Sequence, residues 1–187
     1  YTGMQSQDPG DSEKGSAGGK AGSGSGGKQA RLEMLRRLPV LREATPETVE
    51  RAAGLAVWRH YEPGEMILNI DDASCDVWFV AEGAVRIQVR TPAGRELILS
   101  DMQAGDIFGE IAAIDGAPRT AGATALFRSL LCMIPAAAFI SAACSTPASS
   151  LALLRSVTMI LRRQSKRLLE REALPVRLRL IAELLRL

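Results

Sequence analysis

Short apolar runs alternate with turn-forming residues through the middle of the chain, a pattern typical of antiparallel β structure. The segments 62–65 (Glu-Pro-Gly-Glu), 82–84 (Glu-Gly-Ala) and 92–94 (Pro-Ala-Gly) are turn signals. Seven strands are predicted between such turns, at residues 57–61, 66–69, 77–81, 85–90, 96–100, 121–125 and 130–134. Many short strands at this spacing favour a barrel or a sandwich.

Helical periodicity precedes the strands. A short amphipathic helix, broken at Pro39, is predicted from four regularly spaced leucines: Leu32, Leu35, Leu38 and Leu41. A second helix is predicted to start at Thr45, because a capping hydroxyl followed by Pro46 is a helix start signal, and to end at Gly54.

Helices also follow the strands. Residues 136–142 are predicted to form a short helix, and Pro147 opens a long one that reaches about Leu174. Six of its residues recur at alternating spacings of three and four, as in a heptad seam: Leu151, Leu154, Thr158, Leu161, Ser165 and Leu168. Two interpretations stay open: the helix packs on its own roll, or it also forms a parallel homodimer.

Residues 105–121 contain the chain's most informative motif. They predict a short strand, a Phe-Gly-Glu corner, one helical turn and a Pro-Arg-Thr-Ala run that enters another strand. Arg119 supplies a guanidinium that can hold two oxygens of an anion, and Gly109 permits close backbone approach. Glu110 offers an acceptor and Thr120 a hydroxyl. The alternative makes Arg119 a surface ion-pair partner of Glu110.

This motif resembles the phosphate-binding cassette of the cyclic nucleotide-binding domain, the β-roll of Crp/Fnr regulators, gated channels and kinases. The resemblance implies an α+β, mainly β, fold: an antiparallel β-roll, or double-stranded β-helix, with N-terminal helices and a long C-terminal dimerisation helix. It implies cAMP or cGMP as an allosteric ligand, with Glu110 on the ribose 2′-hydroxyl. Either Ser165, beside Gln164, reads the purine, or it only interrupts the seam. The implied ligand-binding residues are Val85, Leu99, Met102, Gly109, Glu110, Ile111, Ala112, Arg119, Thr120, Gln164 and Ser165.

The segment 175–187 resembles the first helix of the winged helix-turn-helix that follows the dimer helix in Crp/Fnr regulators. The resemblance implies about 50–80 further residues. It also implies a cAMP-responsive transcription regulator whose partners are duplex DNA and RNA polymerase, with no catalytic activity. Two alternatives remain: a sensor module of a channel, transporter or signalling enzyme, and a Crp-like regulator that binds no nucleotide or another small effector.

The predicted organisation has four parts. Residues 1–30 are Gly/Ser-rich and are expected to be a disordered tail or tag. Residues 31–147 form the roll with flanking helices, residues 148–174 the dimerisation helix, and residues 175–187 the start of the next domain.

Composition narrows the class of protein further. The net charge of +2 does not by itself indicate nucleic acid, although residues 151–187 carry nine Arg or Lys against three Glu. Cys75, Cys132 and Cys144 are predicted to be reduced and mostly buried thiols of a cytoplasmic protein. His60 is the only histidine, which argues against a metal site, and no apolar run approaches the length of a membrane span.

Overall fold

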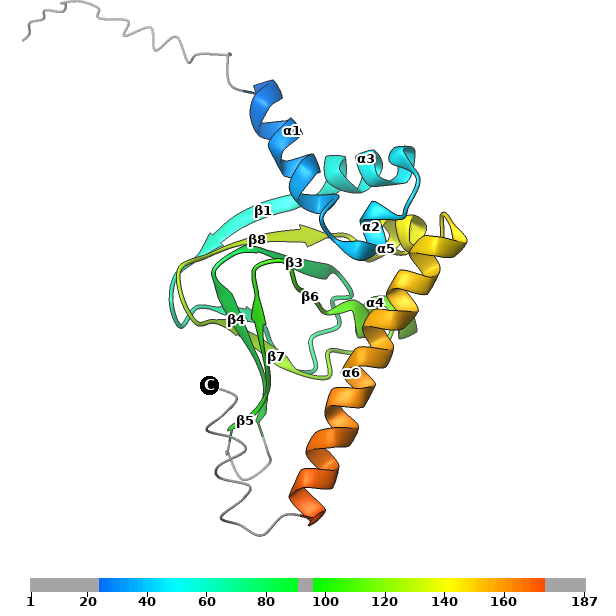
Figure 1. The fold of residues 1–187 in the computed structure, drawn as a ribbon. Helices are drawn as coiled ribbons and strands as arrows, with labels where there is room; N and C mark the ends of the chain where they lie inside the picture. Colours follow the sequence, from blue (N-terminus) through cyan, green and yellow to red (C-terminus); the bar gives the residue numbers. More distant parts are fainter. Residues whose placement is uncertain (1–23, 91–95, 174–187) are drawn as a thin grey trace, which may run out of the picture.

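The computed structural model describes residues 24–90 and 96–173. The predictions for residues 1–23, 92–94 and 175–187 lie outside the described residues. The described strands form a roll flanked by helices (Figure 1). In chain order they are β1 (Val57–Tyr61), β2 (Met66–Leu68), β3 (Val77–Glu82), β4 (Ala84–Arg90), β5 (Glu96–Gln103), β6 (Ile107–Phe108), β7 (Gly122–Ala125) and β8 (Ser129–Ile134).

Two four-stranded sheets make up the roll, in the orders β1-β8-β3-β6 and β2-β7-β4-β5. Every pairing between neighbouring strands is antiparallel. The prediction of a mainly β, antiparallel roll with helices at both ends of the sequence is therefore confirmed.

Strand β3 is apolar almost throughout because both of its faces are covered by other parts of the protein. Successive side chains of a strand point to opposite faces of the sheet. Val77 and Phe79 belong to the cluster that packs against the helices, whereas Trp78 and Val80 pack inside the roll. Trp78 also stacks on Phe108, with ring centroids 6.3 Å apart. No hydrogen-bond acceptor among the described residues reaches its buried indole nitrogen. The two faces of this one strand thus join both hydrophobic cores.

Helices cover one end of the roll, and the longest runs along its side (Figure 1). They are α1 (Gly24–Leu35), α2 (Pro39–Arg42), α3 (Pro46–Leu55), α4 (Glu110–Asp115), α5 (Ala136–Ala143) and α6 (Pro147–Ala173). The side chain of Phe139 on α5 is fully buried among α1, α2 and α3 residues. Burying a side chain of this size contributes about 1.5–3 kcal/mol, which ties the helical layer together.

Helix α1 begins within the predicted tail, earlier than the expected start near Arg31. One side-chain contact involves a residue before Arg31, and a second is made by Arg31 itself. Gln29 Nε2 donates to Glu33 Oε1 at 3.2 Å, one helical turn away. The guanidinium of Arg31 lies over the ring of Trp58, 5.5 Å from its centroid. Helix formation here is therefore driven partly by contacts that composition does not reveal.

Two smaller predictions are wrong. The Thr45 hydroxyl makes no capping bond to the helix backbone; it lies 3.0 Å from the Thr48 hydroxyl, which itself donates to the carbonyl oxygen of Thr45. The cysteines are not mostly buried. Only Cys132, inside the sheet, is buried, whereas Cys75 is half-buried in a loop and Cys144 is exposed just after α5.

Candidate functional site

Arg119 lies at the centre of the candidate site, although it sits in a connecting segment. Only 3% of its surface is exposed. Its Nη1 donates to the carbonyl oxygen of Gly109 at 2.9 Å, and its Nη2 to that of Asp76 at 2.6 Å. Its Nε donates to Ser74 Oγ at 3.2 Å. Burial lowers the pKa of Arg119, and the nearby Asp76 is the main opposing influence. The guanidinium is therefore held in one orientation inside the protein.

Glu110 is the first residue of α4 and is as buried as Arg119, with 3% of its surface exposed. Burial raises the pKa of its carboxyl group, while its own backbone N–H and the charge of Arg119 act in the opposite direction. The preceding Gly109 adopts a φ of +83° and contributes no capping side chain. The alternative of a surface ion pair is wrong, because both side chains are buried.

The apolar members of the predicted ligand set that remain lie on three elements. Val85 is buried on β4 and pairs with Met102, which is half-buried on β5; Leu99 on the same strand is also half-buried. On α4, Ile111 is half-buried and Ala112 is buried.

The polar members of the predicted set are more open. Thr120 is exposed beside the buried Arg119. Gln164 and Ser165 are exposed on α6, and among the described residues no hydrogen bond joins either side chain to Glu110 or Arg119. The structure thus brings together the residues of the motif, but it leaves the two proposed base readers at the surface.

Helix α6 contacts the strand that carries two of these residues. Arg167 Nη1 donates to the carbonyl oxygen of Leu99 and, at 3.3 Å, to that of Ile98. The charge of Arg167 also helps to lower the pKa of Asp101 on the same strand, after the dominant hydrogen bond from Arg86. A direct link therefore connects β5 with the long helix.

The residues of the predicted seam lie on the outside of α6. Leu154, Leu161 and Leu168 are 63%, 65% and 62% exposed. The hydroxyl of Thr158 donates to the carbonyl oxygen of Leu154 at 2.7 Å, so this polar seam residue already has a partner within its own helix. The exposed leucines therefore give α6 an apolar outer face that a second helix could pack against.

Two residues of the site were missed by the sequence reasoning: Ser74 and Asp76, whose Oγ and carbonyl oxygen accept from Arg119. They lie more than forty positions before the arginine. Because every residue has a backbone carbonyl, the residue type at position 76 does not indicate that its carbonyl oxygen accepts from Arg119. The available signal was the unusual Asp-Asp-Ala-Ser-Cys composition of this loop.

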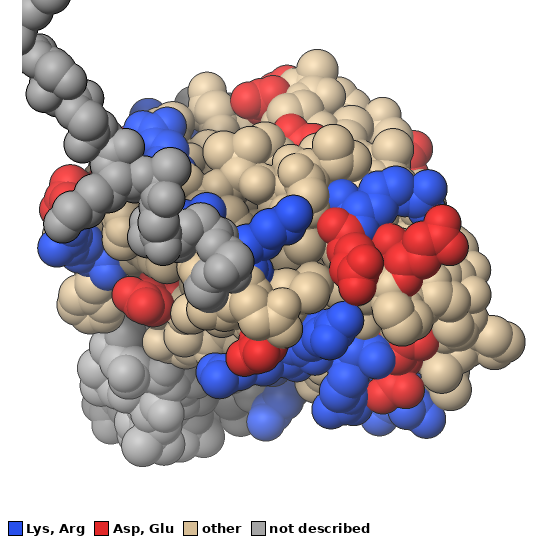
Figure 2. All heavy atoms as spheres, turned by 90° about the horizontal axis from the view of Figure 1, so that it is seen from above, with Lys and Arg blue, Asp and Glu red and all other residues tan. Residues whose placement is uncertain are grey.

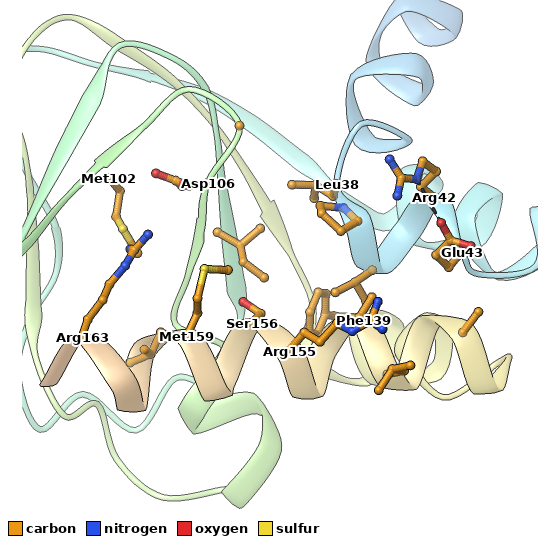
Figure 3. A pocket seen from close by; sticks show the side chains of 18 residues that line it. Leu38, Arg42, Glu43, Met102, Asp106, Phe139, Arg155, Ser156, Met159 and Arg163 are labelled. Atoms are coloured by element: carbon orange, nitrogen blue, oxygen red, sulfur yellow. Dashed lines mark hydrogen bonds and ion pairs between the residues drawn. The ribbon is translucent and has the colours of Figure 1, made fainter. Parts of the chain in front are cut away.

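A separate groove of about 550 Å³ lies between α2, α6 and the turn after β5 (Figure 3). Met159 and Arg163 reach into it from α6, with Met102 and Asp106 on the facing side. Met102 is the one predicted ligand residue in its lining, which includes neither Glu110 nor Arg119. The groove is therefore not the site formed by the motif.

Surface charge, metal ligands and helix hydrophobicity in the described residues bear on other classes of site. Basic and acidic side chains are interspersed on the face viewed in Figure 2, so this face carries no single-sign patch. In the described residues, no three His, Cys, Asp or Glu side chains are placed to hold a metal ion. No single helix in residues 24–90 and 96–173 is long and apolar enough to cross a membrane; α5 and the first part of α6, bent by 115°, pass that test only as a pair.

Comparison with known proteins identifies similar domains in several protein families. The profile of the cyclic nucleotide-binding domain matches residues 58–143. An uncharacterised NTE family protein of Mycobacterium tuberculosis is 29% identical over 128 residues, which is 68% of this chain and 21% of that protein. The CRP-like cAMP-activated global transcriptional regulator of the same organism is 32% identical over 80 residues, 43% of this chain and 31% of that protein.

Solved structures share the fold. The catabolite activator protein of Thermus thermophilus superposes with a TM-score of 0.60 at 25% identity, covering 70% of this chain and 61% of that one. The chain spans only about a fifth of the NTE family relative. The profile match contains the whole motif with Gly109, Glu110 and Arg119, and residues 58–143 therefore belong to the cyclic nucleotide-binding domain family.

Proposed function

We propose that this domain binds cAMP through Arg119 and Glu110 and acts as the sensor of a Crp/Fnr-type transcription regulator. The observation that carries the proposal is a buried guanidinium that donates to the carbonyl oxygen of Gly109, the residue directly before the buried carboxyl group of Glu110 at the start of α4. A guanidinium has five N–H donors, and three of them have protein acceptors here. The other two suit the anionic oxygens of a cyclic phosphate, and the carboxylate suits a ribose hydroxyl.

Ligand binding would be coupled to α6 through β5. Leu99 and Met102 on β5 are proposed to contact the nucleotide, and Arg167 of α6 donates to the carbonyl oxygen of Leu99. A nucleotide that moves β5 therefore changes a contact of the long helix. A homodimer formed through Leu154, Leu161 and Leu168 would pass this change to DNA-binding segments beyond α6. The exposed Gln164 and Ser165 remain the proposed readers of the base.

A second candidate function is a nucleotide sensor within a larger protein of another class. One observation favours it: the match to the NTE family protein extends over 68% of this chain, against 43% for the CRP-like regulator. Under this proposal α6 would transmit the same signal to a domain other than a DNA-binding one.

Titration calorimetry of the 187-residue chain with cAMP, cGMP and 5′-AMP tests the shared part of both proposals. Saturable binding of cAMP, strongly weakened by Arg119→Ala, supports the site. The absence of saturable binding for both cyclic nucleotides in a folded chain would overturn it.

The two classes separate in a gel-shift experiment with the full-length protein. A Crp/Fnr-type regulator should bind a two-fold symmetric duplex more tightly when cAMP is present. The 187-residue chain should bind duplex DNA weakly, without sequence preference and only at low salt, through phosphate contacts alone. A full-length protein with no cAMP-dependent DNA binding favours the second candidate.

A further inference from the structure

The loop formed by residues 71–76 is bound to Arg119 along the backbone of both segments. The Arg119 N–H donates to the carbonyl oxygen of Asp72 at 3.0 Å, and the Asp71 N–H donates to the carbonyl oxygen of Arg119 at 3.1 Å. Asp71 has a φ of +65°, in a region that residues other than glycine rarely adopt. The arginine is thus attached to a loop with a defined and unusual backbone conformation.

Ser74 is fixed within this loop. Its backbone N–H donates to Asp72 Oδ1 at 2.8 Å, which forms a local turn. Its hydroxyl accepts the hydrogen of Arg119 Nε at 3.2 Å. Ser74 is half-buried, and these two contacts connect it to its own loop and to Arg119.

The three acceptors around the guanidinium are of two kinds. Gly109 and Asp76 contribute carbonyl oxygens, at 2.9 Å from Nη1 and 2.6 Å from Nη2. Ser74 contributes the only side-chain acceptor of the three. Because Nε carries one hydrogen and each terminal nitrogen carries two, one N–H is left on each terminal nitrogen. Two N–H groups of this kind make up the fork that grips two oxygens of a phosphate.

We infer that Ser74 is a positioning residue that orients the guanidinium of Arg119 for two-point contact with the cyclic phosphate. The inference rests on the proposed function of the site. The Nε contact resists rotation of the guanidinium about its last single bonds, so the side chain loses less conformational freedom when the ligand binds. A side chain that acts in this way changes ligand affinity through Arg119 and does not itself touch the nucleotide.

The first test compares variants of Ser74 in competition binding against fluorescently labelled cAMP. Ser74→Ala should bind cAMP about 3–10-fold more weakly, the scale of one rotamer-rich side chain left to be ordered on binding. Ser74→Thr keeps the hydroxyl and should stay within about 2-fold of the unaltered chain. Ser156→Ala, a half-buried serine on α6, is the matched control and should bind normally.

A double-mutant cycle distinguishes positioning from a purely structural role. In an Arg119→Lys background there is no Nε–H for the hydroxyl to hold, so adding Ser74→Ala should leave affinity unchanged. An equal loss in both backgrounds would show that Ser74 only supports the loop, and it would overturn the inference. Unaltered affinity of Ser74→Ala would overturn it as well. A chain that binds no cyclic nucleotide in the first place would instead overturn the proposed function.

Discussion

A Cβ atom added to Gly109 would lie 2.6 Å from Nη1 of Arg119. Carbon atoms of side chains do not approach other heavy atoms so closely, so the guanidinium rests on a residue that has no side chain. The same added atom would lie 3.0 Å from the carbonyl oxygen of Asp76, another partner of the arginine. The glycine of the motif is therefore required by the arginine as well as by the backbone turn.

Gly109→Ala should lower both stability and affinity for cAMP. The positive φ costs about 1–2 kcal/mol for a residue with a Cβ, and the clash also displaces Arg119. Gly105→Ala is the matched control, because Gly105 has a φ of +101° but nothing within 4 Å of its added Cβ. Both variants should unfold at lower denaturant concentration, whereas only Gly109→Ala should lose affinity in calorimetry. Equal cAMP affinities for the two variants would contradict the close contact between residue 109 and Arg119.

Arg119→Ala should weaken cAMP binding by about 1.5–3 kcal/mol, the scale of hydrogen bonds to a charged group. Arg119→Lys should also bind less well, because an ammonium group cannot reproduce the planar fork. Calorimetry measures the affinities, and circular dichroism verifies that each variant remains folded. A folded Arg119→Ala variant with unchanged affinity would remove Arg119 from the site.

Glu110→Gln should bind cAMP more weakly if the carboxylate accepts a hydrogen bond from the ribose 2′-hydroxyl. The matched ligand is 2′-deoxy-cAMP, which lacks that hydroxyl. Its affinity should fall much less than that of cAMP between the unaltered chain and the variant. Equal losses for the two ligands would assign Glu110 to support of the loop alone.

Glu110 should also make stability depend on pH. Burial raises its folded-state pKa above the ordinary value of 4.5, so the folded chain binds the proton more tightly than the unfolded chain. The free energy of unfolding should therefore increase as pH falls through the folded pKa, and this contribution should be complete below about pH 4.5. Glu110→Gln lacks it. At about pH 8 the buried carboxylate of the unaltered chain carries a cost that the neutral Gln side chain does not, so the variant should be the more stable of the two. Urea unfolding should show this difference in the free energy of unfolding becoming smaller as pH falls to about 5. A constant difference would contradict the raised pKa.

The exposed leucines of α6 predict a homodimer, and Leu161→Glu should abolish it. A carboxylate placed between two seams would be buried without a partner, which is strongly unfavourable. Leu55→Glu makes the same substitution at an exposed leucine on α3, outside the seam, and should leave the dimer intact. Sedimentation velocity with and without cAMP distinguishes the species. A monomeric unaltered chain at tens of micromolar would refute the seam.

Much of the fold was predictable because its strands and helices are indicated by patterns of neighbouring residues. Short apolar runs separated by turn residues predicted the strands, and Pro147 marked the start of α6. The two sheets could not be paired from the sequence, since the partners of β3 lie far along the chain in β6 and β8. Thr45 illustrates the limit at residue level: its type suits a helix cap, but the hydroxyl of Thr48 offered a competing partner.

The site was predictable to the extent that one contiguous motif contains it. Gly109, Glu110 and Arg119 lie within eleven consecutive residues, and the structure brings them together. The partners from the 71–76 loop come from a different part of the sequence, and tertiary folding alone brings them to the arginine. The burial that shifts the pKa of Glu110 likewise arises from packing and not from residue type.

The stacking of Trp78 on Phe108 gives the domain an internal optical reporter. Phe108 directly precedes Gly109, so any movement of the turn that carries Glu110 must alter the surroundings of the indole ring. The chain contains only two tryptophans, and Trp58→Phe would leave Trp78 as the sole source of indole emission. Events at the turn formed by Gly109 and Glu110 can then be followed by fluorescence in real time, without attaching a dye to either the protein or the ligand.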